Sequence, residues 1–274
     1  MATEIYRPFY KPEGVMEFLG LGTDSFIGTV GATTVLKYPK TPGDKAALAT
    51  LGLEAQILTT IGPHKHIIGF KEERADGLLL ERASCGSIAQ FLKDYTPSQQ
   101  QRLAWARQAT EAVAVTHSAG VIHCDINAQN LLLDENLTVK LCDFQGRLCR
   151  PDGSVDKDGL ARENIKSFMP RADPNYADRK TDIFALASAF YYIMRGHEPF
   201  PELDPGTQEQ QITERFTSHK YPQLGCSLMD RVTHKCWTGE YDSAEAVLQD
   251  LISDPASPVT GGVMGELMHV GNLT

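Results

Sequence analysis

The chain has 274 residues, of which 42 % are hydrophobic and 22 % charged, and these ordinary proportions exclude wholesale disorder. Its formal net charge of −9 excludes the overall basic footprint of a general nucleic-acid binder, while a local basic patch stays open. The longest apolar run, residues 183–194, is too short for a membrane helix, and the first residues lack a secretory signal. We therefore expect six reduced cysteines, a cytoplasmic or nuclear location, and neither a membrane nor a nucleic acid among the partners.

The first third of the chain predicts a β-rich region with one helix. Four residues, Leu48, Leu51, Leu58 and Ile61, recur at helical spacing and predict a helix over residues 45–61. Short apolar or β-branched runs, separated by Gly, Asp and Pro, predict strands at residues 18–21, 26–30, 33–37, 67–70 and 78–80.

The rest of the chain is mainly helical. We expect helices over residues 87–93, 98–118 and 180–194, three amphipathic helices up to residue 252, and two strands at residues 130–133 and 139–142. The helix over 180–194 is apolar on every face, which predicts burial on all sides. Residues 147–174 are polar and without periodicity, so we expect a long ordered loop. These elements divide the chain into a small β-rich lobe (1–83), a larger helical lobe (84–253) and a tail (254–274), with a cleft near residues 80–86.

One segment, residues 121–144, carries the strongest chemical pattern; it reads VIHCDINAQNLLLDENLTVKLCDF. It resembles the catalytic loop and the metal-binding DFG motif of eukaryotic protein kinases. The resemblance implies that Asp125 accepts the proton of the substrate hydroxyl and that Asn130 and Asp143 bind Mg²⁺. A turn-rich hairpin with solvated Asp and Asn is the alternative reading.

Two pieces of the same pattern lie upstream. Residues 19–30 resemble the glycine-rich loop that covers ATP phosphates, with Gly20 and Gly22 on its first two glycines and Ser25 at the third position. A plain β-hairpin would look the same. The sequence TVLK then resembles the V-A-I-K strand, so Lys37 would pair the α- and β-phosphates and Glu54, on the predicted helix, would hold Lys37 by an ion pair.

The resemblance also assigns positions around the nucleotide. Leu80 would be the gatekeeper, the backbone of Glu81 and Ala83 would bind adenine, Ser87 would lie near the ribose, and Ile27, Val35 and Leu132 would enclose the adenine ring. Leu58, Phe70, His123 and Phe144 would stack on Asp182 as a hydrophobic spine, with Asp182 accepting backbone N–H bonds from the catalytic loop. Cys142 would face the ATP pocket.

The distal segments decide between branches of this superfamily. Residues 181–200 are similar to the protein-kinase core helix that opens with Asp, and the HKCW sequence at 234–237 with the SAEAVLQDL that follows resembles the closing helices of the same domain. Small-molecule phosphotransferases lack this distal half. The resemblance covers about residues 14–253 and implies an α+β bilobal protein-kinase-like fold. In its general sequence character the chain most resembles the divergent kinase-like proteins of filamentous fungi.

Four positions depart from the family pattern. Cys124 replaces the Arg before the catalytic Asp, Asn127 stands where a Lys or Arg is usual, Gln145 replaces the Gly of DFG, and Arg171 replaces the Glu of A-P-E. The reversed charge at position 171 predicts an ion pair with Glu240 or Asp242 near the end of the chain, the alternative being a solvated Arg171.

The implied function is transfer of the ATP γ-phosphoryl group, with ATP and Mg²⁺, to a Ser or Thr hydroxyl of a protein. The alternative from another class is an ATP-binding pseudokinase that acts as a scaffold. In the family, the Arg that Cys124 replaces binds a phosphate on the loop that corresponds to residues 147–174. Because that Arg is absent and this loop has only two hydroxyl side chains, Ser154 and Ser167, we expect any activity to be independent of phosphorylation of the loop.

Overall fold

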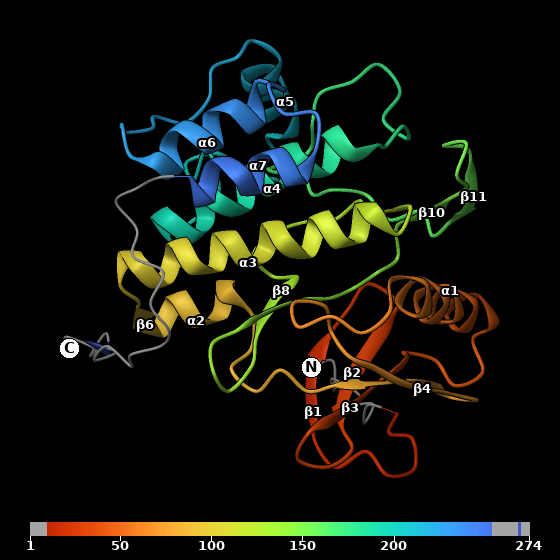
Figure 1. Ribbon diagram of the computed structural model, residues 1–274. Helices are drawn as coiled ribbons and strands as arrows, with labels where there is room; N and C mark the ends of the chain where they lie inside the picture. Colours follow the sequence, from red (N-terminus) through yellow and green to blue (C-terminus); the bar gives the residue numbers. More distant parts are fainter. Residues whose placement is uncertain (1–9, 254–267, 270–274) are drawn as a thin grey trace, which may run out of the picture.

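A computed structural model of the chain describes residues 10–253 together with residues 268 and 269. Most of the predicted tail, 254–274, therefore lies outside the described residues. Within them the chain forms two lobes, a β-rich one followed by a helical one, as predicted (Figure 1).

The β-rich lobe is a five-stranded antiparallel sheet with one helix against it. The strands are β1 (Phe18–Leu21), β2 (Ser25–Thr29), β3 (Thr34–Pro39), β4 (Phe70–Arg74) and β5 (Gly77–Glu81), in the order β1-β2-β3-β5-β4. The helix α1 (Lys45–Ile61) packs on β3, β4 and β5 and begins where the Asp44 carboxylate accepts hydrogen bonds from two backbone N–H groups. Its bounds are those that the helical spacing predicts.

The predicted strand over residues 67–70 is wrong in part, because only Phe70 belongs to β4. Ile67 and Ile68 instead join the other lobe: the Ile68 N–H donates to the Leu141 carbonyl at 2.9 Å, and the Leu141 N–H donates to His66 at 2.9 Å. An apolar run identifies buried extended chain but does not identify its pairing partner.

The helical lobe is built around two long helices, α3 (Gln99–Ser118) and α4 (Arg179–Arg195). Every residue of α4 from 181 to 191 is buried, which confirms the prediction from its uniformly apolar sequence. Four shorter helices complete the lobe: α2 (Ile88–Asp94), α5 (Glu209–Thr217), α6 (Leu228–Trp237) and α7 (Ala244–Ile252). In Figure 1, α3 runs between α7 and the hairpin of β8 (Leu131–Leu133) and β9 (Val139–Leu141), and it contacts both.

Residues 147–174 were expected to form a loop, but they begin with a hairpin. Strands β10 (Arg147–Cys149) and β11 (Val155–Asp158) pair with each other, and β10 also pairs with β7 (Val121–Ile122). The prediction missed these strands because β11 is exposed along its whole length and so has no apolar alternation. Two further short strands, β6 (Tyr95–Thr96) and β12 (Met268–His269), pair with each other.

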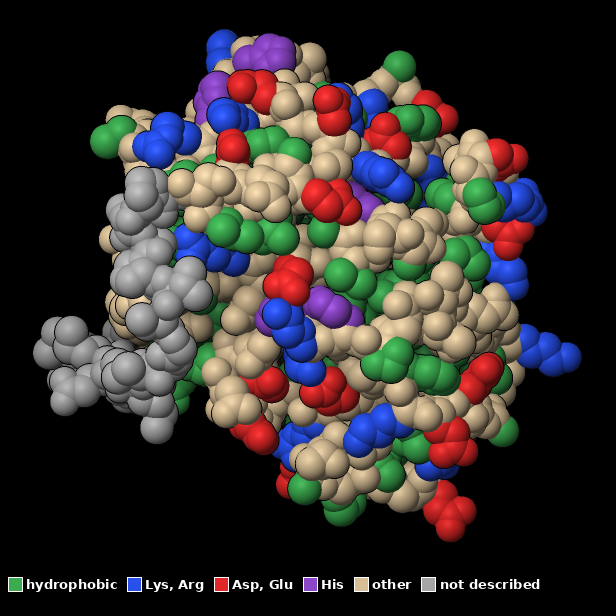
Figure 2. Space-filling model, in the orientation of Figure 1, with side chains coloured by type: hydrophobic (Ala, Val, Ile, Leu, Met, Phe, Trp, Pro, Cys, Tyr) green, Lys and Arg blue, Asp and Glu red, His purple; other side chains and the backbone are tan. Residues whose placement is uncertain are grey.

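No helix among the described residues is long and apolar enough to cross a membrane. On the face shown in Figure 2, acidic and basic side chains are interspersed and no large patch of one sign is visible.

Candidate functional site

A cavity of about 580 Å³ lies between the two lobes. The β1–β2 turn, β3, α1, the connection after β5, the start of α2 and the β8–β9 hairpin all contribute to its walls. Nearly all of the predicted nucleotide-binding residues line it: Gly20, Gly22, Ile27, Val35, Lys37, Glu54, Leu80, Glu81, Ala83, Ser87, Leu132 and Asp143. Residues separated by more than 100 positions in the sequence thus share one cavity.

Ser25 is the exception among these predictions. It is 4 % exposed at the start of β2 and is not among the residues that line the cavity. Its carbonyl accepts a hydrogen bond from the Gly22 N–H at 2.8 Å, so it closes the turn from within. The third position of the glycine-rich pattern is therefore structural in this chain.

Three charged side chains meet on one side of the cavity. The Lys37 Nζ lies 2.6 Å from Glu54 Oε2 and 2.5 Å from Asp143 Oδ1. Burial alone would lower the pKa of Lys37, but the charges of Glu54 and Asp143 raise it above its ordinary value. Burial likewise opposes ionisation of Asp143, yet Lys37 lowers the pKa of that carboxyl. Burial and the charge of Asp143 raise the pKa of Glu54 in spite of Lys37, so Lys37 is the shared counter-charge of two carboxylates that do not stabilise each other.

The predicted catalytic carboxylate, Asp125, is held by two amides. Asn127 Nδ2 donates to Asp125 Oδ1 at 2.9 Å, and Asn130 Nδ2 donates to Asp125 Oδ2 at 2.8 Å. Asn127 Oδ1 in turn accepts the backbone N–H of Gln129 at 2.8 Å, which fixes the amide. Burial raises the pKa of Asp125 to about 6. Asn127, where the family pattern has a cation, thus orients the carboxylate without adding charge.

A buried carboxylate, Asp182, accepts backbone hydrogen bonds from the catalytic loop, as predicted. Asp182, 0 % exposed, accepts the backbone N–H groups of His123 at 2.8 Å and Cys124 at 2.9 Å. Cys124 has a φ of 66°, a strained value for a non-glycine residue, and the Asp182 bond holds it there. The His123 and Phe144 rings pack edge to face with centroids 4.9 Å apart, which confirms that part of the predicted spine.

Gly146, which follows the unusual Gln145, lies very close to the backbone of residues 122 and 123. A Cβ on Gly146 would lie 2.1 Å from the Ile122 carbonyl oxygen and 2.4 Å from the His123 carbonyl oxygen. The chain after Asp143 can therefore pass against the catalytic loop only because residue 146 is glycine.

The predicted partner of Arg171 is wrong. Arg171 Nη2 lies 2.8 Å from Glu163 Oε2, whereas Asp242 pairs with Lys180 at 3.0 Å and Glu240 accepts from the Thr238 hydroxyl at 2.7 Å. Residues 147–174 correspond in position to the activation segment of protein kinases, and we use that name for them. Arg171, near the end of this activation segment, is thus tied to an acid eight residues earlier in the same segment. A charge reversal can be satisfied by any acid that the fold brings near, and the sequence does not identify which one.

Several residues of the cavity were not predicted. Arg82, Lys93, Gln129 and Tyr192 also line it, from the connection after β5, the end of α2, the catalytic loop and α4. Only Gln129 lies inside a recognisable motif, so the sequence gives no sign of the other three. Cys142, predicted to face this pocket, does line it, and burial raises the pKa of its thiol.

Asn130 and Asp143 are the two predicted metal ligands. Among the described residues no cluster of three or more His, Cys, Asp or Glu side chains is arranged to hold a metal ion. Asp143 uses Oδ1 for Lys37, and Asn130 uses its amide nitrogen for Asp125. The other carboxylate oxygen and the amide oxygen are hard ligands, and Mg²⁺ commonly takes one or two protein ligands together with substrate phosphates and water. The two residues therefore fit a Mg²⁺ ion that arrives with a nucleotide.

Comparison with known proteins agrees with this geometry. The family model of the protein kinase domain matches residues 29–254, starting just after the glycine-rich turn. Serine/threonine-protein kinase PKH1 of Saccharomyces cerevisiae is 32 % identical over 190 residues, which cover 63 % of this chain and 25 % of that protein. Mitogen-activated protein kinase kinase kinase mom-4 of Caenorhabditis elegans is 33 % identical over 239 residues, 78 % of this chain and 43 % of that protein. The chain thus spans less than half the length of either relative.

The match covers the charged groups of the cavity and the helices that follow, but not the Gly20–Gly22 turn, which also lines the cavity. Protein kinases generally use ATP and Mg²⁺, and the lining residues and oxygen ligands described above suit both. Since the match extends over most of the chain and the two lobes have the expected architecture, the chain belongs to the protein kinase domain family.

Proposed function

We propose that this chain is an ATP-dependent protein kinase that transfers the γ-phosphoryl group to a Ser or Thr hydroxyl of a protein. One observation carries the proposal: Asp125, which does not itself line the cavity, accepts a hydrogen bond from Asn130, and Asn130 lines the cavity together with Lys37 and Asp143. A general base and a charged phosphate site are the two parts that phosphoryl transfer requires.

In the proposed reaction the residues of the chain bind, orient and accept a proton. Lys37, fixed by Glu54, would pair the phosphates of ATP, and the Gly20–Gly22 turn would cover them with backbone N–H groups. Asp125 would orient the acceptor hydroxyl and take its proton, with its oxygens already aligned by two amides. Mg²⁺ held by Asn130 and Asp143 would neutralise the charge that develops on the transferred group.

The preference for Ser or Thr rests on similarity and on one sequence feature. The yeast relative is named a serine/threonine-protein kinase. In addition, residues 147–174 contain no tyrosine, the residue that tyrosine kinases commonly autophosphorylate in this segment.

The pseudokinase alternative rests on the departures at positions 124, 127 and 145. The arrangement around Asp125 weighs against it, because Asn127 keeps a positioning role although it lacks a charge. The presence of Lys37, Glu54, Asp125, Asn130 and Asp143, together with the contacts of Lys37 to Glu54 and Asp143 and of Asn130 to Asp125, supports the active kinase.

The test measures phosphate transfer and nucleotide binding separately. The protein is incubated with radiolabelled ATP, Mg²⁺ and a library of Ser-, Thr- and Tyr-containing peptides, beside Asp125→Asn and the matched surface control Asp94→Asn. We expect transfer to Ser and Thr peptides that Asp125→Asn lowers about 10²–10⁴-fold and that Asp94→Asn leaves unchanged. An ATP-dependent rise in melting temperature without any transfer would establish the pseudokinase instead.

A further inference from the structure

A buried ion pair joins two residues of the activation segment, Glu163 and Arg171. Glu163 and Arg171 lie 2.8 Å apart, and their side chains are only 1 % and 8 % exposed. Arg171 also donates to the Met169 carbonyl at 3.0 Å and stacks on the Phe168 ring, with 4.1 Å between the guanidinium carbon and the ring centroid. The pair thus fixes the shape of residues 163–171, because a guanidinium buried in this way cannot leave its carboxylate without a large penalty.

The same stretch is fastened to the helical lobe at its centre. Lys166 is 3 % exposed, and its Nζ donates to the carbonyl groups of Phe200 and Leu203 at 2.7 Å each, in the connection between α4 and α5. The chain just before this stretch is also held in place, because the Gly159 N–H donates to the Gly146 carbonyl at 2.9 Å. Fixed charges and backbone bonds therefore hold the segment at several points.

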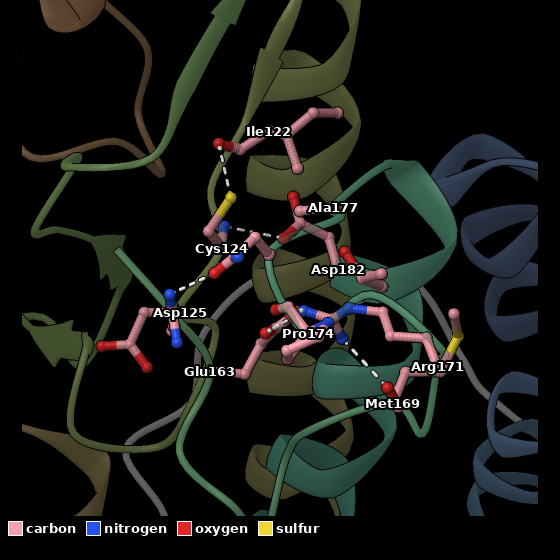
Figure 3. Close-up of polar contacts among 12 residues, drawn as sticks. Ile122, Cys124, Asp125, Glu163, Met169, Arg171, Pro174, Ala177 and Asp182 are labelled. Atoms are coloured by element: carbon pink, nitrogen blue, oxygen red, sulfur yellow. Dashed lines mark hydrogen bonds and ion pairs between the residues drawn. The ribbon is translucent and has the colours of Figure 1, made fainter. Parts of the chain in front are cut away.

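Glu163 lies beside the catalytic loop. Figure 3 shows Arg171 reaching across to Glu163 next to the loop that carries Cys124 and Asp125. Burial, together with the negative charges of Asp182 and Glu163, raises the pKa of the Cys124 thiol, which reflects this proximity. Cys124 brings no cation to Glu163; its own thiol donates to the Ile122 carbonyl at 3.6 Å. The counter-charge of Glu163 therefore comes from Arg171.

Of the two serine hydroxyl groups in residues 147–174, that of Ser167 is buried, and that of Ser154 is exposed but already donates to Asp152. Ser167 is 4 % exposed, and Ser154 lies in the β10–β11 turn with its hydroxyl on Asp152 at 2.6 Å. The arginines of the segment already have partners: Arg147 with Asp158, Arg150 with Asp156 and Arg162 with Asn175. A phosphate here would have to displace a bond that already exists.

We propose that Glu163 and Arg171 are positioning residues for the phosphotransfer proposed above. Their ion pair holds residues 163–171 against the catalytic loop, so that the segment beside Asp125 is assembled by fixed charges and needs no phosphorylated residue. This inference rests on the proposed kinase activity. It adds that the unmodified side chains of Glu163 and Arg171 are sufficient to hold residues 163–171 in the active arrangement.

The first experiment compares protein purified with and without phosphatase treatment, with the phosphate content read from the intact mass. The expected result is that kcat/KM for a Ser peptide agrees within about twofold between the two preparations. A loss greater than about tenfold in the phosphate-free protein would overturn the proposal.

The second experiment is a double-mutant cycle with Glu163→Gln, Arg171→Met and the double variant. Each single change should lower kcat/KM for the peptide at least about tenfold while KM for ATP stays within about twofold, and the second change should add less than about twofold to the first. Arg150→Met, which removes the exposed Arg150–Asp156 pair of the same segment, is the matched control and should have no effect.

Hydrogen exchange of the backbone amides of residues 161–169 provides a readout besides activity. We expect faster exchange in Glu163→Gln than in the unaltered protein, with an unchanged ATP-induced melting shift that shows an intact nucleotide site. Independent, additive effects on kcat/KM or unaltered exchange would contradict the inference. If the unaltered protein binds ATP but transfers no phosphate, the proposed function itself fails, which is a different outcome.

Discussion

The cavity and the activation segment both contain buried ion pairs, but they assemble them in opposite ways. Lys37 on β3 meets Glu54 on α1 and Asp143 in the connection after β9, across 17 and 106 residues of sequence. Glu163 and Arg171 are eight residues apart on one irregular segment. The long-range group follows the family pattern at every position, whereas the local pair occupies a place where the pattern has changed.

This difference shows which constraints the reaction imposes. In the proposed reaction the cavity group would hold phosphates and a metal, so each charge would need a defined sign and place. The segment has only to be held in position, and any buried pair of opposite charges with good geometry serves that purpose. The following predictions test whether the two regions are separable in this way, beginning with the largest expected effect.

Removing the charge of Arg171 should destabilise the fold more than removing an exposed charge of the same segment. Arg171→Met leaves the Glu163 carboxylate buried without its partner, at an expected cost of about 3–5 kcal/mol in the free energy of unfolding. Arg150→Met, whose pair is 54 % and 34 % exposed, should cost about 0–1 kcal/mol. Urea denaturation measures both, and equal losses would contradict the burial argument.

Removing the charge of Lys37 should affect chemistry rather than the activation segment. Lys37→Met should lower kcat/KM by about 10²–10³-fold and weaken the ATP-induced melting shift, because it deletes the cation that Glu54 and Asp143 hold in the cavity. Hydrogen exchange of residues 161–169 should stay unchanged. Lys71→Met, at an exposed lysine of β4 that bonds to Thr33 and Thr34, serves as control.

The loss of the Asn127 amide should reduce the rate of transfer without affecting ATP binding. Asn127→Ala removes one hydrogen bond to the Asp125 carboxylate and the fixed acceptor for the Gln129 N–H. We expect kcat to fall about tenfold or somewhat more, with KM for ATP unchanged, since a hydrogen bond to a charged group contributes about 1.5–3 kcal/mol. An unchanged kcat would show that Asn130 alone orients the carboxylate.

The smallest expected effect is on the reactivity of Cys142. Because this thiol lines the cavity and burial raises its pKa, iodoacetamide should modify it more slowly than the exposed Cys226. ATP with Mg²⁺ should slow the modification of Cys142 further and leave that of Cys226 unchanged. Mass spectrometry of tryptic peptides measures both rates, and equal protection at the two cysteines would argue against a nucleotide beside Cys142.

Local sequence determined much of the framework. Asp44, Ser87 and Ser98 each accept backbone N–H bonds at the start of a helix, and the helices that follow begin within a residue of their predicted positions. The motif that contains Asp125, Asn130 and Asp143 predicted that these residues lie near one another, and Asn130 does donate to the Asp125 carboxylate, because the short catalytic loop and the β8–β9 hairpin after it have spacings that fix their geometry. Periodicity, capping and loop length all act over a few residues, so the sequence alone conveys them.

Other features depended on which segments meet in space. The β10–β11 hairpin forms against β7, Ile68 bonds to β9 instead of extending a strand, and Ser25 lies outside the cavity that its neighbours line. The partner of Arg171 is the clearest case, since Glu163, Glu240 and Asp242 were all acids within the same chain. Tertiary structure decided among them, because a buried charge pairs with whichever opposite charge the packed backbone holds within hydrogen-bonding distance, and side-chain charge alone conveys no distance.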